Sequence, residues 1–166
     1  MHVRVADPAD AAALSIVAAQ TFPLACPPSA PTQDIASFVK ANLSTDRFEE
    51  YLTDPHRAIL KADHDGRIIG YAMAIREVAD PGFSVELSKL YVVPDFHGQG
   101  VAAMLMDAVL ALTLDWGAPR VWLGVNQHNV RAQRFYTKSG FVVSGTRTFQ
   151  LGTHLEHDYV MTRKTG

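Results

Sequence analysis

Residues 90–103 place an apolar strand, a glycine-rich turn and an apolar helix directly one after another, with the sequence L-Y-V-V-P-D-F-H-G-Q-G-V-A-A. Gly98 and Gly100 allow a tight turn whose backbone N–H groups can approach a ligand closely. The helix that follows directs the partial positive charge of its N-terminus at the same point. The segment therefore predicts a diphosphate site and, with it, a nucleotide-derived cofactor.

Three classes of ligand use such a turn, and the neighbouring residues distinguish them. A nucleoside triphosphatase requires a Lys followed by Ser or Thr, and this pair does not follow Gly100. A dinucleotide fold requires a glycine spacing that Gly98, Gly100 and Ala103 fit only loosely, and an acidic residue about 20 residues further on. The next predicted strand ends in Asn126 instead. The residues downstream favour the third class, coenzyme A.

Composition limits the class of protein further. A chain of 166 residues is expected to form one domain, residues 1–166, with a substantial core. The contents of 48% hydrophobic and 19% charged residues are typical of a soluble globular protein. A net charge of -2 gives no general attraction to nucleic acid or to an anionic membrane. Neither a long apolar run nor a leader pattern is found, so we expect a cytoplasmic protein.

Periodicity, capping residues and prolines predict the elements along the chain. Strands are predicted at residues 2–6, 57–62, 67–76, 84–93, 120–125, 141–151 and 155–163. Helices are predicted at residues 9–20, 32–42, 45–52, 98–116 and 129–139, with Asp7, Thr32 and Ser44 or Thr45 as N-caps and Gly140 as a terminator.

Turn residues complete the predicted topology. The sequence D-H-D-G at residues 63–66 predicts a hairpin, and Pro81-Gly82 predicts another turn. Residues 22–31 are expected to be irregular because four prolines interrupt them; the single cysteine, Cys26, is expected to be incidental there. The predicted order is β-α-α-β-β-β-α-β-α-β-β, an α/β (α+β) fold with a central mixed sheet of about seven strands and helices on both faces.

Two motifs resemble signatures of the GNAT superfamily of N-acetyltransferases. The motif [RQ]-x-x-G-x-[GA] corresponds to residues 97–102, with His97 at the position usually occupied by Arg or Gln. The motif N-x-x-A-x-x-[FL]-Y-x-K-x-G-F corresponds at every position to Asn129, Ala132, Phe135, Tyr136, Lys138, Gly140 and Phe141. The resemblance covers residues 66–164 and implies the GNAT fold, whose central sheet is splayed. Several segments, such as E-L-S-K-L-Y-V-V-P, resemble bacterial spermidine/spermine-type acetyltransferases, although Gln127 stands where that branch often carries an acid.

The resemblance implies acetyl-CoA as the cosubstrate. The opened edge of the central strand would pair with the pantetheine arm like an added strand, through the backbone of Val92 and Val93. An amide near Val92 would face the thioester carbonyl oxygen as negative charge develops there. His97 would either add charge to the diphosphate or point at solvent, and Arg131, Arg134 and Lys138 would either meet a phosphate or remain solvated. The implied cofactor-binding set is Leu90, Tyr91, Val92, Val93, His97, Gly98, Gln99, Gly100, Val101, Ala102, Asn129, Arg131, Phe135, Tyr136 and Lys138.

Acetyl transfer to a primary amine needs a proton acceptor, because an alkylamine with a pKa of about 10.4 is almost entirely protonated at pH 7. Glu86 is the candidate base, acting directly, through water, or only as an anchor for the ammonium; a surface ion pair is the structural alternative. In a regular strand Glu86 and Val92 would share one face, although a bulge between them would change that parity. The resemblance assigns Tyr136 as the acid that protonates the leaving thiolate; a core tyrosine beside Phe135 is the alternative.

The expected activity is direct transfer of an acetyl group, in a ternary complex, to the primary amine of a small molecule, with polyamines among the candidates. Acetylation of protein N-termini or lysines and a non-catalytic acyl-CoA sensor are the alternatives. No metal is expected, because His154 and His157 are three residues apart in a predicted strand and so face opposite ways. The closing strands are compatible with a homodimer. Two further sets of residues have two possible roles each. The phenylalanines either line the acceptor site or belong to the core: Phe22, Phe38 and Phe48. The acids either attract a cationic substrate or are solvated surface charges: Asp34, Asp46, Glu49, Glu50 and Glu77.

Overall fold

The computed structural model describes residues 1–79 and 82–165. Within these residues, seven strands form one mixed sheet in the order β1-β2-β3-β4-β5-β7-β6. The strands are β1 (His2–Val5), β2 (Arg57–His64), β3 (Arg67–Ala79), β4 (Gly82–Val92), β5 (Arg120–Asn126), β6 (Val142–Leu151) and β7 (His154–Lys164). The helices are α1 (Ala11–Ala25), α2 (Thr32–Asn42), α3 (Thr45–Thr53), α4 (Val101–Asp115) and α5 (Val130–Lys138), with short 3-10 turns at Pro8–Asp10 and Pro94–Phe96.

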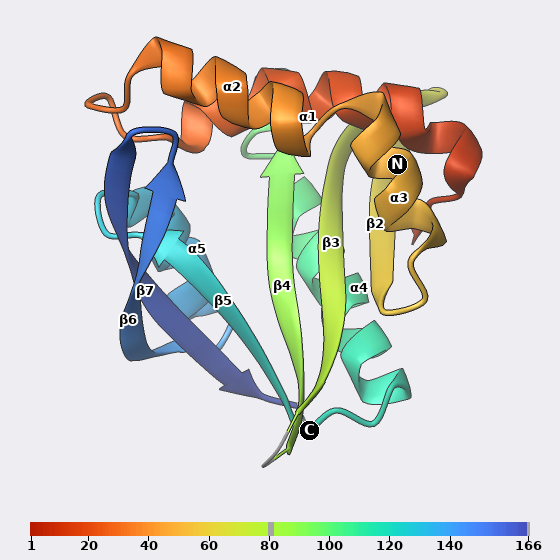
Figure 1. Cartoon of the computed structure of the whole chain (residues 1–166). Coiled ribbons are helices and arrows are strands. Elements are labelled where there is room, and N and C mark those ends of the chain that lie inside the picture. Colours follow the sequence, from red (N-terminus) through yellow and green to blue (C-terminus); the bar gives the residue numbers. More distant parts are fainter. Residues whose placement is uncertain (80–81, 166) are drawn as a thin grey trace.

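The predicted α/β class and mixed sheet are confirmed, with one change in the order of elements. The whole stretch between β1 and β2 is described and holds three helices, which agrees with the three ranges predicted there, whereas the predicted order gave only two. Figure 1 shows α1 and α2 along the top of the sheet, while α4 lies behind β3 and β4. Buried residues of α4, such as Leu105 and Val109, join the main core.

The expectation of irregular structure at residues 22–31 is wrong for its first part, because α1 continues through Pro23 to Ala25. Pro23 is the third residue from the end of α1, so its missing N–H removes one hydrogen bond, to the carbonyl of residue 19, close to that end. Packing compensates for that loss. Phe22 is buried and stacks on Phe38 with ring centroids 4.6 Å apart, and the Thr21 hydroxyl donates to the Val17 carbonyl at 2.8 Å.

The predicted helix starts and turns have mixed outcomes. Ser44 caps α3 as predicted, whereas Asp7 caps the 3-10 turn Pro8–Asp10 that leads into α1; they accept from the N–H groups three and two residues further on. Thr32 is not a cap, because α2 already begins there and Pro31 precedes it. The hairpin between β2 and β3 is confirmed, with positive φ at Asp65 and Gly66. The turn predicted at Pro81-Gly82 includes Pro81, which lies outside the described residues.

The sheet is splayed between β4 and β5. Among the described residues these two parallel strands pair only at Val85 with Val121 and at Glu86 with Trp122, and beyond that point they diverge (Figure 1). The pairing of β4 with β3 shifts between Met73 and Ala74, which leaves Ser88 as a bulged residue of β4. The result is a gap between two half-sheets that is closed at one end and open at the other.

Candidate functional site

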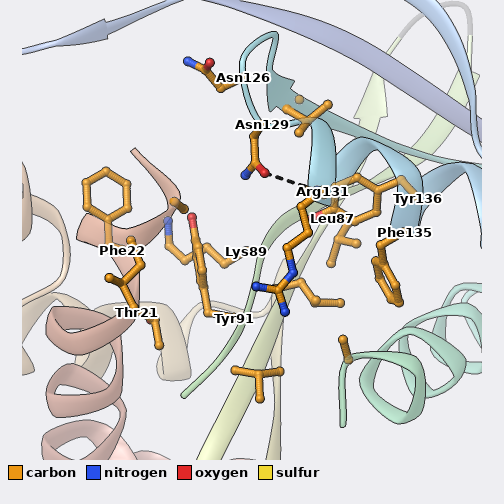
Figure 2. Close-up of a pocket in the computed structure, with 18 of the residues that line it drawn as sticks. Thr21, Phe22, Leu87, Lys89, Tyr91, Asn126, Asn129, Arg131, Phe135 and Tyr136 are labelled. Carbon is orange, nitrogen blue, oxygen red and sulfur yellow. Dashed lines mark hydrogen bonds between the residues drawn. The ribbon is translucent and has the colours of Figure 1, made fainter. Parts of the chain in front are cut away.

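A cavity of about 680 Å³ lies in the gap between the two half-sheets. Figure 2 shows Thr21, Phe22, Lys89 and Tyr91 on one side of it and Asn129, Arg131, Phe135 and Tyr136 on the other. Most residues of the predicted site line this cavity: Glu86, Leu90, Tyr91, Val92, His97, Gly98, Gly100, Val101, Ala102, Asn129, Arg131, Phe135 and Tyr136.

The glycine-rich turn at one end of the cavity has the geometry of an anion cradle. Gly98 and Gly100 have φ of +78° and +81°, a region that glycine adopts without strain, so α4 begins at Val101 rather than at the predicted Gly98. A Cβ atom at either glycine would meet no atom within 4 Å, so the space above the turn is open. Within residues 1–79 and 82–165, no backbone carbonyl accepts from the N–H groups of residues 98–103. These donors at a helix N-terminus fit a pyrophosphate.

The backbone of β4 presents Val92 to the gap. The Val93 N–H donates to the Ile69 carbonyl of β3 at 2.9 Å, so Val93 faces its sheet partner. Because successive residues of a strand point their N–H and C=O groups to opposite sides, the N–H and C=O of Val92 point into the gap. Val93 is also 1% exposed and does not line the cavity. Of the two valines, therefore, Val92 is the one that presents its backbone groups to the gap.

His97 is exposed and lines the cavity, and it also makes a contact that neither predicted role included. Its Nε2 lies 2.7 Å from the Val92 carbonyl oxygen, and since a carbonyl can only accept, Nε2 carries the proton. The ring thus ties the turn back to the end of β4. It also occupies the Val92 carbonyl, while the Val92 N–H still faces the gap.

Tyr136 lies on α5 between Phe135 and Phe141, with ring centroids 5.6 Å and 6.1 Å away. Burial raises its pKa to about 12, so the phenol is protonated at neutral pH and can act as a proton donor. On the same helix, the Asn129 side chain accepts from the Ala132 N–H at 3.1 Å and caps α5. Burial raises the pKa of Tyr91, which also lines the cavity.

Glu86 lies at the closed end of the gap, where its side chain is 18% exposed. Burial is the main cause that raises its pKa; Glu77 raises it further, while Arg147 opposes the shift. A carboxylate whose pKa is raised is a stronger base than a solvated one. The bulge at Ser88 changes the parity of β4, so Glu86 and Val92 do not share a face as a regular strand would have them.

Several cavity residues were missed by sequence reasoning. Glu156 and Asp158 of β7 are each 6% exposed, and Arg147 of β6 forms an ion pair with Asp158 at 3.2 Å. Lys89 of β4 has its pKa lowered to about 8, chiefly by burial and then by Arg57. The alternation of Glu156 and Asp158 in β7 was the available signal, but it does not reveal which side of the sheet faces the cavity.

Cys26 also lines the cavity and, as expected, lies in irregular structure, directly after the last residue of α1. Burial, reinforced by the charge of Glu156, raises the pKa of its thiol to about 11. The thiol is therefore protonated at neutral pH, which is unfavourable for a nucleophile.

Other predicted residues lie elsewhere. Gln99 and Lys138 are exposed and do not line the cavity. Phe22 and Phe38 line it, whereas Phe48 is fully buried in the core. Asp34 accepts from the backbone N–H and the hydroxyl of Thr153, and so joins α2 to the β6–β7 turn. The remaining acids, Asp46, Glu49, Glu50 and Glu77, do not line the cavity.

No three His, Cys, Asp or Glu side chains converge as metal ligands would in residues 1–79 and 82–165. Over the same residues, no helix combines the length and the apolar character needed to cross a membrane.

Comparisons with known proteins agree on one family. The family model described as "Acetyltransferase (GNAT) family" matches residues 26–141. An uncharacterized N-acetyltransferase of Mycobacterium tuberculosis is 65% identical over 155 residues, which cover 93% of this chain and 97% of that protein. A peptidyl-lysine N-acetyltransferase of Salmonella typhimurium is 39% identical over 59 residues, which cover 36% of this chain and 37% of that protein.

Solved structures give the same fold. The PaiA N-acetyltransferase from Thermoplasma acidophilum, in complex with coenzyme A, superposes with a TM-score of 0.83 at 20% sequence identity. The match covers 99% of each chain.

Proposed function

Since this chain belongs to the GNAT family of acetyltransferases and is an acetyl-CoA-dependent N-acetyltransferase, we propose that it acetylates the primary amine of a small molecule. One observation carries the proposal: a single cavity holds the free N–H groups of the turn, the Val92 backbone, the Tyr136 phenol and the Glu86 carboxylate. Acetyl-CoA supplies an activated acetyl group as a thioester. These residues provide the groups that bind it and transfer the protons.

The cofactor end of the cavity is assigned to the glycine-rich turn and α5. The N–H groups of residues 98–103 would bind the pyrophosphate, and the exposed Arg131 is placed for a further phosphate. The Val92 N–H, which points into the gap, would donate to the thioester carbonyl oxygen as it gains negative charge. The Val92 carbonyl is already held by His97, which fixes the orientation of that peptide.

An ammonium has no free electron pair, so it first loses one proton to solvent; attack by the resulting neutral amine then requires two proton transfers. The amine nitrogen forms a bond to the acetyl carbon as the carbon–sulfur bond breaks, and the electron pair of that bond leaves with sulfur. Glu86 accepts the proton that the nitrogen loses, directly or through water, and Tyr136 gives a proton to the sulfur. A phenol with a pKa of about 12 donates to a thiolate and is reprotonated from solvent before the next turnover.

The acceptor end of the cavity favours a cationic amine with an apolar part. Phe22 and Phe38 stack there, and Phe149 contacts Phe38 edge to face at 5.5 Å. Three acids, Glu86, Glu156 and Asp158, line the same cavity and outnumber the two cations nearby, Lys89 and Arg147. Such a surface attracts an ammonium group and packs against methylene carbons, as a polyamine offers. A lysine side chain has the same chemistry, and the partial match to a peptidyl-lysine acetyltransferase makes protein lysines the second candidate.

The test measures the release of free coenzyme A from acetyl-CoA with panels of polyamines, amino acids, aminoglycosides and lysine peptides, and identifies each product by mass spectrometry. We expect turnover with small amines and much slower turnover with peptides. Turnover with peptides alone would overturn the small-molecule acceptor and favour the second candidate. Calorimetric titration with acetyl-CoA is run in parallel, and a lack of binding would contradict the site assignment itself.

A further inference from the structure

The Arg147 side chain crosses the face of the sheet above a glycine. Arg147 projects from β6, and its guanidinium lies so close to Gly124 of β5 that a Cβ atom there would overlap it. The guanidinium carbon is 5.5 Å from the centre of the Trp122 ring, which lies two residues earlier on β5. Glycine at position 124 therefore provides the room in which this side chain lies.

The guanidinium connects the two half-sheets across the gap. Its Nε lies 3.2 Å from Oδ2 of Asp158, the residue that pairs with Arg147 across β6 and β7. Its Nη1 lies 3.9 Å from Oε2 of Glu86 on β4. Asp158 and Glu86 are mostly buried, with side chains 9% and 18% exposed. One cation thus lies between two acids from opposite sides of the splay.

We propose that Arg147 is a positioning residue for amine acetylation: its guanidinium, placed over Gly124 and held by Asp158, orients the Glu86 carboxylate as proton acceptor. The inference rests on the proposed function, in which Glu86 is the base. It assigns to Gly124 a specific purpose, which is to leave space for this cation inside the cavity.

The charges around Glu86 determine how its protonation depends on pH, so the loss of Arg147 should be detectable in a pH profile. Burial and Glu77 on β3 raise the Glu86 pKa, whereas Arg147 on β6, Lys89 on β4 and Arg57 on β2 lower it. On the far side of the guanidinium, Asp158 of β7 pairs with Arg147, while Glu156 of β7 accepts from the Asn126 amide and lies beside His154. Removing Arg147 therefore raises the Glu86 pKa further, and the base stays protonated up to a higher pH.

The experiment records kcat/KM against pH for the full chain with one amine acceptor. In Arg147→Gln the acid limb is expected to move to higher pH by about one unit, because an opposite charge at this distance shifts a carboxyl pKa by that order. The dissociation constant of acetyl-CoA should stay within about twofold, since Arg147 lies away from the turn. Arg4→Gln, which removes an equal charge from an exposed ion pair on β1, should leave the limb in place.

Gly124→Ala provides a second, independent variant, because it keeps the charge and displaces the guanidinium. It should move the acid limb in the same direction, and it should have no further effect in the Arg147→Gln background. An unshifted limb in both single variants, or additive shifts in the double variant, would overturn the inference.

Glu86→Gln separates this inference from the proposed function. If Glu86→Gln abolishes the acid limb while the Arg147 and Gly124 variants leave it unmoved, the positioning role is wrong and the base assignment stands. If the limb persists in Glu86→Gln, the base assignment fails and the positioning role fails with it.

Discussion

Tyr136 and Lys89 line the same cavity, and burial moves the pKa of each in the direction that favours its neutral form. The Tyr136 pKa rises to about 12, and the Lys89 pKa falls to about 8. Burying the charged form, a phenolate for Tyr136 or an ammonium for Lys89, is unfavourable in free energy because the charge loses its hydration. At the scale of single residues, the cavity therefore keeps the Tyr136 phenol protonated as a proton donor. It also makes Lys89, next to the acceptor site, lose its positive charge more easily than a solvated lysine does.

Replacing Tyr136 by Phe should lower kcat by at least about 100-fold, because general acid catalysis contributes about that much or more. Phe keeps the packing against Phe135 and Phe141, so the affinity for acetyl-CoA should hardly change. Stopped-flow turnover and calorimetric titration check the two parts. Tyr51→Phe, which removes a hydroxyl bonded to the Asn42 carbonyl far from the acid position, should keep the wild-type kcat. Equal rates in Tyr136→Phe and wild type would contradict the acid role.

Replacing Lys89 by Met should change how stability depends on pH. The Lys89 pKa is about 8 in the folded protein and 10.5 as its ordinary value. Between these two values the unfolded chain binds more protons, so the stability of the wild type relative to Lys89→Met should rise with pH, by up to about 3 kcal/mol in total. Urea unfolding at pH 7, 8, 9 and 10 measures this difference. A difference that stays flat from pH 8 to 10 would show that Lys89 is solvated.

At the scale of elements, the strand–turn–helix of residues 90–103 could be predicted from sequence because it depends on local geometry. The positive φ values of Gly98 and Gly100 and the start of a helix are properties of adjacent residues. The extension of α1 through Pro23 could not be predicted, since it depends on the stacking of Phe22 on Phe38. Arg147 and Asp158 were missed for a similar reason, because their place in the cavity follows from the long-range register of β6 with β7.

Gly100→Ala should weaken acetyl-CoA binding more than it weakens the fold. Alanine at φ of +81° costs about 1 kcal/mol of stability, and its methyl group would project into the open space assigned to the pyrophosphate. We expect KM for acetyl-CoA to rise by about tenfold or more. Gly117→Ala is the matched control, because Gly117 has φ of +74° and equally open space but lies after α4. A similar KM in both variants would argue against the cradle.

At the scale of the whole molecule, the two half-sheets are joined by few contacts. Among the described residues, β4 and β5 pair at two positions near the closed end of the gap. At the open end, α2 lies beside the β6–β7 turn, where Thr153 donates to Asp34 through its N–H at 3.3 Å and its hydroxyl at 2.9 Å (Figure 1). Asp34 is 8% exposed, so this contact is shielded from water.

Asp34→Ala should therefore destabilise the protein by about 2 kcal/mol, the order expected when hydrogen bonds to a buried charged acceptor are lost. It should also weaken acetyl-CoA binding several-fold, because the spacing of the half-sheets is less firmly set. Glu49→Ala, at an exposed position of α3, should stay within about 0.5 kcal/mol of wild type. Guanidinium unfolding and calorimetry check both effects. Equal unfolding free energies for the two variants would show that the Asp34 contact is dispensable.

The short seam between β4 and β5 has a consequence for how the protein responds to its surroundings. A compound that spans the splay contacts both halves when they are folded and neither when they are unfolded, so it stabilises the native chain by mass action. At a concentration about 100 times its dissociation constant, that gain is about 2.7 kcal/mol. The melting temperature of this protein should then rise with the concentration of acetyl-CoA. Without acetyl-CoA, the protein should unfold at a lower temperature and be cleaved faster by proteases.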